Sequence, residues 1–162
     1  MENLEVKRKV EEFLKEEGVI FPKGPINEFY SQFVKLSGFG IGGLLTFSGK
    51  KAGKLAGSYI RKMAQNDNLS PKDLLDYVCN FLEGSGIAKI ESYEVQNDKI
   101  VIKAKNSIFA QGVENKKPIC MPLAGALSGV FEEVLDQEWE CKEVECQAQK
   151  KESCIFELKR KN

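Results

Sequence analysis

Histidine is absent from the 162 residues of this chain. Without it, the sequence has no Ser-His-Asp triad, no Cys-His dyad and no imidazole ligand for a haem or a metal. Acidic and basic residues balance at 24 each, so the formal net charge is zero. A dedicated nucleic-acid-binding domain usually carries a basic excess. These shortages exclude the histidine-dependent enzyme classes and argue against nucleic acid as a partner.

Long apolar runs are also missing. The longest nearly apolar stretch covers residues 39–47, whereas a transmembrane helix needs about 20 residues. The N-terminal residues are charged and lack the apolar core of a secretory signal, so we expect a cytoplasmic protein without a membrane partner. Only three of the basic residues are arginines, and a bias toward lysine and glutamate is typical of heat-adapted proteins.

The first half of the chain has a helical pattern. Ser70 and Pro71 give one of its helices a strong start, because serine caps a helix and proline fits the first turn. Apolar residues recur at helical spacing in four segments, which are residues 3–17, 26–36, 44–65 and 71–83.

The second half alternates apolar and polar residues, which is typical of strands. Asn97-Asp98 fits a two-residue hairpin turn. The expected elements are strands at 90–96 and 99–105, a helix at 121–136, and strands at 139–148 and 154–159. Helices beside hairpins indicate an α+β domain with an antiparallel sheet made of the two hairpins. We expect one such domain over residues 1–162, with residues 1–19 as an N-terminal helix that extends it.

Three glycines mark one face of the third expected helix. Gly49, Gly53 and Gly57 recur every four residues, so they share a side of that helix. A face without side chains lets another helix approach closely, within the chain or from a second copy. We expect tight packing or a dimer contact at this stripe, and we predict a homodimer.

Five cysteines remain, and in a cytoplasmic protein they are usually thiols or metal ligands rather than disulfides. Cys79 falls in an apolar helix, where a small core residue is the simplest role. Cys120 precedes the helix at 121–136, and Cys146 and Cys154 flank the loop of the last hairpin. Spacing alone leaves two interpretations open. The thiols are scattered, or three of them and a glutamate form a tetrahedral zinc site, since zinc accepts both ligand types.

Residues 118–158 resemble the vinyl-4-reductase domain family, and their sequence is PICMPLAGALSGVFEEVLDQEWECKEVECQAQKKESCIFEL. The shared features are a Cys, a helix rich in small residues, a strand with Glu-x-x-Cys, and a further Cys that begins the last strand. The resemblance implies a fold similar to the TRAPP vesicle-tethering subunits and to haem nitric-oxide-binding domains. Family members include ligand-sensing domains of aromatic-responsive transcription activators, proteins tied to bacteriochlorophyll vinyl reduction, and stand-alone archaeal proteins. This chain looks most like the last group.

The same resemblance implies a structural zinc ion. Phenol-sensing relatives hold zinc with Cys, Glu, Cys and Cys, and the spacing of those ligands coincides here with Cys120, Glu143, Cys146 and Cys154. In a regular strand Glu143 and Cys146 would face opposite sides, so a β-bulge or a strand end must lie between them. We expect lysines or backbone N–H groups to offset the negative charge, and the lysines in question are Lys142, Lys150 and Lys151.

The ligand implied by the resemblance differs from phenol. The sensors use a histidine to hold the phenol hydroxyl, and this chain has none. We therefore predict a non-enzymatic domain that binds a small hydrophobic molecule. Its binding residues are not assigned, and Phe109, Trp139 and Tyr93 are candidates only as bulky side chains near the sheet. The family name supports an alternative, a reductase or reductase accessory acting on a vinyl group of a tetrapyrrole-like substrate. The trafficking relatives support a third, a protein–protein adaptor.

Overall fold

The computed structural model describes residues 3–37, 40–65 and 68–161 of the chain. In this part, four helices precede a hairpin, a fifth helix and a second hairpin, so the predicted α+β fold class is confirmed. The elements are α1 (Leu4–Glu17), α2 (Lys23–Ser37), α3 (Ile41–Ala64), α4 (Pro71–Gly84), β1 (Lys89–Gln96), β2 (Lys99–Lys105), α5 (Met121–Leu135), β3 (Trp139–Glu145), a short 3₁₀ helix η1 (Gln147–Gln149) and β4 (Cys154–Arg160).

The sheet is antiparallel throughout, with the strand order β1-β2-β4-β3. The two hairpins join through their second strands, where Ile102 of β2 lies opposite Phe156 of β4. Alternate residues of these strands are buried, and the side chains between them are partly exposed. This alternation follows from the two-residue period of a strand, and it leaves the sheet one apolar face to cover.

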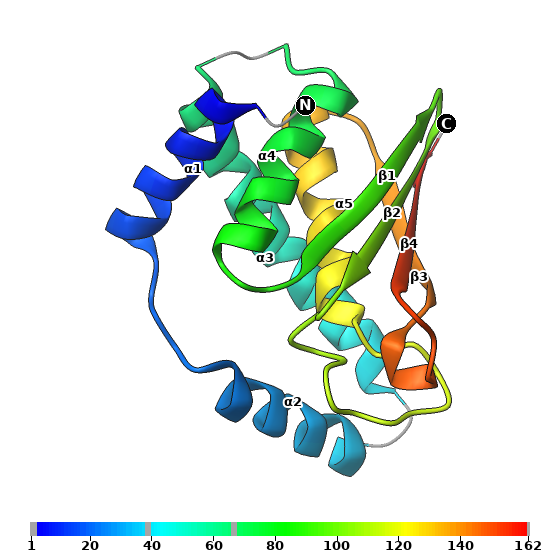
Figure 1. Ribbon diagram of the computed structural model, residues 1–162. Coiled ribbons are helices and arrows are strands. Elements are labelled where there is room, and N and C mark those ends of the chain that lie inside the picture. The colour runs from blue at the N-terminus through cyan, green and yellow to red at the C-terminus, as the bar shows by residue number, and fades with distance from the viewer. Residues whose placement is uncertain (1–2, 38–39, 66–67, 162) are drawn as a thin grey trace.

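Helices cover that face in two layers (Figure 1). α4 packs against β1, and α5 packs against β3 and β4. α3 lies along α5, and α1 packs on α4 with Val6 and Val10 in the common core. α2 lies apart from the other helices at the bottom of the view. In the described residues, no helix combines the length and apolar character needed to cross a membrane.

The predicted start of α4 is confirmed by its cap. The Ser70 hydroxyl accepts a hydrogen bond from the Asp73 N–H at 3.2 Å, and the Asp73 carboxylate accepts one from the Ser70 N–H at 3.2 Å. This capping box satisfies two N–H groups at the helix end. Such a cap contributes about 1 kcal/mol to stability.

The glycine stripe of α3 packs against α5 of the same chain. A Cβ atom added at Gly53 would lie 2.1 Å from the Ala126 carbonyl oxygen, and one at Gly49 would lie 2.2 Å from that of Pro122. Any side chain at these positions would force the two helices apart. The expected tight packing is therefore present, and the stripe is not available as a dimer contact.

Three predicted boundaries were wrong. α3 begins at Ile41 rather than residue 44. The third strand ends at Glu145 rather than Ala148, because residues 147–149 turn into η1. α2 begins at Lys23 rather than residue 26, since Pro25 lies within its first turn, where a proline has no N–H bond to lose.

Candidate metal centre and apolar cavity

Four residues converge at the start of α5 and the loop end of the second hairpin. Cys120 is the N-cap of α5, Glu143 lies in β3, Cys146 directly follows β3, and Cys154 begins β4. One ligand atom of each lies within 4.8 Å of the others. The three cysteines have no exposed surface, and Glu143 is 8% exposed. The structure therefore brings together the whole ligand set predicted from the sequence.

A β-bulge makes this convergence possible. Glu143 lies opposite Phe156 and Glu145 lies opposite Ile155, so the register between β3 and β4 shifts at Val144. β3 then ends at Glu145. The extra residue and the strand end reverse the usual alternation, as the three-residue spacing required. Glu143 and Cys146 consequently point to the same side.

The three sulfurs form a nearly equilateral triangle. Cys120 Sγ lies 3.9 Å from Cys146 Sγ and 4.0 Å from Cys154 Sγ, and the latter two sulfurs are 3.9 Å apart. Sulfurs about 2.3 Å from a tetrahedral zinc ion would be about 3.8 Å apart. All three cysteines are free thiols. The triangle thus has the size that a zinc ion requires.

The Glu143 carboxylate supplies the fourth corner. Its Oε2 accepts a hydrogen bond from the Cys120 N–H at 2.7 Å, whereas its buried Oε1 has no hydrogen-bond partner within the described residues. Burial, together with the nearby Cys146 sulfur, raises the pKa of Glu143 to about 8. A buried acceptor left unpaired costs about 1–3 kcal/mol. A cation among the sulfurs would satisfy this oxygen and favour its charged form, so the residues present fit a metal ion.

Two backbone N–H groups contact the sulfurs, whereas the three lysines considered from the sequence are exposed. Lys142, Lys150 and Lys151 are exposed, and Lys150 pairs with Glu114 at 3.4 Å. Backbone N–H groups were the second expected source of compensation for the negative charge of the cluster, and they are present. Such donors offset part of the charge of a thiolate. The Gln147 N–H lies 3.3 Å from Cys154 Sγ, and the Ile119 N–H donates to Cys146. The side chain of Ser107 adds a contact of 3.3 Å between its Oγ and Cys120 Sγ.

The other two cysteines lie outside the cluster. Cys79 is half-buried in α4, and burial raises its pKa to about 12. Cys141 is buried in β3, and burial likewise raises its pKa above the ordinary value. Both are therefore neutral thiols with no role in the cluster.

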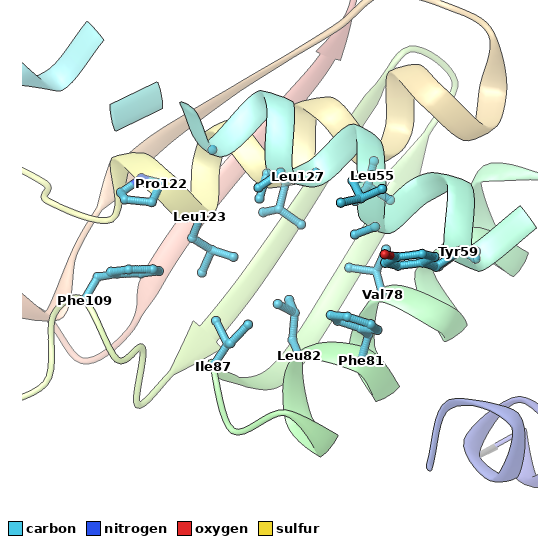
Figure 2. Close-up of a pocket in the computed structure, with 17 residues that line it drawn as sticks. Leu55, Tyr59, Val78, Phe81, Leu82, Ile87, Phe109, Pro122, Leu123 and Leu127 are labelled. Atoms are coloured by element: carbon cyan, nitrogen blue, oxygen red, sulfur yellow. The ribbon is translucent and has the colours of Figure 1, made fainter. Parts of the chain in front are cut away.

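A second feature is an apolar cavity of about 380 Å³ between α3, α4 and α5. Of its 17 lining residues, only Tyr59 has a polar side chain. Figure 2 shows an elongated space with Phe109 and Pro122 near one end and Tyr59 near the other. It reaches the surface beside Leu55, which lines it and is 56% exposed.

Only one of the three bulky candidates belongs to this cavity. Phe109 lines it. Trp139 instead packs edge-on against Phe131 at 5.5 Å between ring centroids, and the Tyr93 hydroxyl donates to Asp76 at 3.4 Å. The other lining residues went unassigned because their helical spacing marks a buried face without telling whether that face meets a neighbour or a void.

A family model matches the segment that carries the cluster. Residues 100–160 match the vinyl-4-reductase (V-4-R) domain. Two uncharacterized proteins of Methanocaldococcus jannaschii are similar in sequence. One is 32% identical over 100 residues, which cover 56% of this chain and 57% of the relative. The other is 28% identical over 92 residues, covering 56% and 49%. The chain thus spans about half the length of the curated relatives it matches.

Solved structures share the fold. The phenol-responsive sensory domain of the transcription activator PoxR, determined with phenol, has a TM-score of 0.71 and 14% identity, covering 88% of this chain and 76% of that one. A trafficking protein particle complex subunit 3 from Naegleria fowleri, covalently bound to palmitic acid, gives 0.67 and 18%, with 86% and 95% covered. A vinyl-4-reductase family protein from Methanocaldococcus jannaschii gives 0.59 and 24%, with 98% and 94% covered. The family match thus covers residues 100–160, and the chain shares its fold with a vinyl-4-reductase family protein.

Proposed function

We propose that this chain is a binding domain for a small hydrophobic molecule, held in the cavity between α3, α4 and α5. The cavity is the observation that carries the proposal. Its volume of about 380 Å³ falls within the range of roughly 300–1,000 Å³ typical of ligand sites. It is also lined almost entirely by apolar side chains. Binding of an apolar molecule there would remove both the ligand and the cavity wall from water.

The lining favours a chain-like apolar ligand over a phenol. Tyr59 at one end is the single side-chain partner that a phenolic hydroxyl would find among the lining residues. A buried polar group without a partner costs about 1–3 kcal/mol, whereas each buried methylene contributes about 0.8 kcal/mol. Of the ligands present in the similar structures, palmitic acid suits this cavity better than phenol, provided that its tail fills the cavity and its carboxylate stays in water at the opening beside Leu55.

We also propose that the Cys120, Glu143, Cys146 and Cys154 cluster binds one structural zinc ion. Three thiolates and a carboxylate fill all four positions of a tetrahedral site, so no position is left for an activated water. Zinc would join the start of α5 to the end of β3 and the start of β4. The ion would thereby hold in place the helix that forms one wall of the cavity, and its role would be structural rather than catalytic.

Calorimetric titration with palmitic acid, below its micelle-forming concentration, and with phenol tests the binding proposal. We expect palmitic acid to bind more tightly. The variant Ala56→Phe adds a ring inside the cavity and should weaken this binding at least tenfold. Ser58→Phe adds the same ring to α3 away from the cavity lining and should bind as the original chain does. Tighter binding of phenol, or equal binding by both variants, would contradict the proposal.

A further inference from the structure

The basic side chains of α3 fall into two groups. α3 carries five basic residues and no acidic one. Three of the five pair with carboxylates of or directly after α5, and these are Lys50 and Lys54 with Glu132 at 2.5 and 2.7 Å and Arg61 with Asp136 at 2.7 Å. Within the described residues, the other two, Lys51 and Lys62, have no carboxylate at ion-pair distance.

Lys51 and Lys62 lie over aromatic rings instead. The Lys51 Nζ is 5.4 Å from the ring centroid of Phe47, and the Lys62 Nζ is 6.0 Å from that of Tyr59. Both lysines are exposed, and a contact between a cation and a ring is weak at an exposed site. An anionic partner can therefore take the place of either ring.

Of these two contacts, the one made by Lys62 lies at the apolar cavity. Tyr59 lines the cavity, whereas Phe47 does not. Figure 2 shows Tyr59 and Leu55 at the same end of the cavity, which opens beside the exposed Leu55. Tyr59 follows Leu55 by four residues and Lys62 follows Tyr59 by three, so the three side chains share one side of α3. The Lys62 ammonium therefore stands at the mouth of the cavity.

The Tyr59 hydroxyl is a second donor at this mouth. It has no hydrogen-bond partner within the described residues, and it is the single polar side-chain group among those that line the cavity. A carboxylate has two acceptor oxygens, so it can accept from the Tyr59 hydroxyl and the Lys62 ammonium together. Its apolar chain would then extend into the cavity.

We infer that the ligand of the cavity is a long-chain carboxylate whose head group is held at the mouth by Lys62 and the Tyr59 hydroxyl. This inference rests on the proposed function, because it adds a head-group site to the cavity proposed to hold an apolar chain. Hydrogen bonds to an ionised group are roughly twice as strong as neutral ones. The two donors therefore discriminate a carboxylate from a neutral molecule of the same chain length.

Calorimetric titration with lauric acid and with dodecanol, at about pH 8 where lauric acid is ionised, tests the head-group site. The two molecules have equal chain lengths and differ in the charge of the head group. We expect the original chain to bind lauric acid about tenfold more tightly than dodecanol. Lys62→Gln should weaken lauric acid binding about tenfold and leave dodecanol binding unchanged, which also shows that the variant is folded. Tyr59→Phe keeps the ring and should weaken lauric acid binding more than dodecanol binding.

Lys51→Gln is the matched control, because it removes the same charge from the same helix. Lys51 lies about three turns before Lys62, or about 16 Å along the helix axis. That distance exceeds the screening length of about 8 Å at physiological ionic strength. Lys51→Gln should therefore bind lauric acid as the original chain does.

Three results would overturn the head-group site. They are equal binding of lauric acid and dodecanol by the original chain, unchanged binding of lauric acid by Lys62→Gln, and an equal loss in Lys51→Gln, which would assign the preference to the general positive charge of α3. If dodecanol binds as tightly as lauric acid and Ala56→Phe weakens both, the head-group site fails and the binding proposal stands. If neither molecule binds, the binding proposal fails and the head-group site fails with it.

Discussion

Replacing Cys146 by serine should release the metal and lower the melting temperature. Cys146 Sγ lies 3.9 Å from each of the other two sulfurs, so its loss opens one corner of the tetrahedron. A bound ion cross-links Cys120 to Cys146 and to Cys154, which lie 26 and 34 positions away in the sequence. In the chain-entropy description, a cross-link that closes one such loop contributes about 3.5 kcal/mol. For a domain of this size, that corresponds to a fall of about 7–14 °C in melting temperature.

Cys141→Ser is the matched control, because it makes the same change of atom at another buried position of the second hairpin. Elemental analysis should find one zinc per chain in the original protein and in Cys141→Ser, and none in Cys146→Ser. Scanning calorimetry should then show the larger fall for Cys146→Ser alone. Equal metal contents, or equal falls in melting temperature, would refute the cross-link argument.

Two further predictions concern the same elements. In chelator-treated protein, Glu143 has a folded-state pKa of about 8 against an ordinary 4.5, so its contribution to stability is present at low pH and is lost as the pH rises toward 8. Glu143→Gln should remove this part of the pH dependence. Urea unfolding at several values between about pH 5 and 8 gives the free energy of unfolding as a function of pH. The same change with pH in both proteins would contradict the prediction. Gly53→Ala should destabilise the chain by about 1–3 kcal/mol, since its Cβ would lie 2.1 Å from the Ala126 carbonyl oxygen. Gly43→Ala on the same helix, with nothing within 4 Å, should be neutral or stabilising, and equal thermal melts would count against the close packing of α3 on α5.

Local patterns were sufficient for the elements but not for their ends. Alternation and the Asn97-Asp98 turn predicted the first hairpin, because one buried face requires a two-residue period. The pattern continues through Ala148, yet β3 ends at Glu145. The bulge at Val144 and the turn at Cys146 bring side chains of distant segments together. The alternation of apolar and polar residues within one strand carries no information about contacts with distant segments, so it could not predict where β3 ends.

The two candidate sites differ in how far the sequence could predict them. The resemblance placed Glu143 and Cys146 in one ligand set, and the structure brings them together. The cavity could not be predicted, since Leu82 and Leu127 would look the same in a filled core. Similarly, the spacing of Gly53 and its neighbours predicted a close helix approach without identifying α5 as the partner. Both outcomes depend on distances between helices that are far apart in the chain.

Native mass spectrometry of the purified protein tests most directly whether the cavity between α3, α4 and α5 holds a hydrophobic molecule. We predict that each 18.2 kDa chain carries one zinc and one apolar adduct that organic solvent extracts. Ala56→Phe, which fills part of the cavity, should carry the zinc without the adduct. An original chain without an adduct, which also takes up no palmitic acid when it is added, would contradict the account.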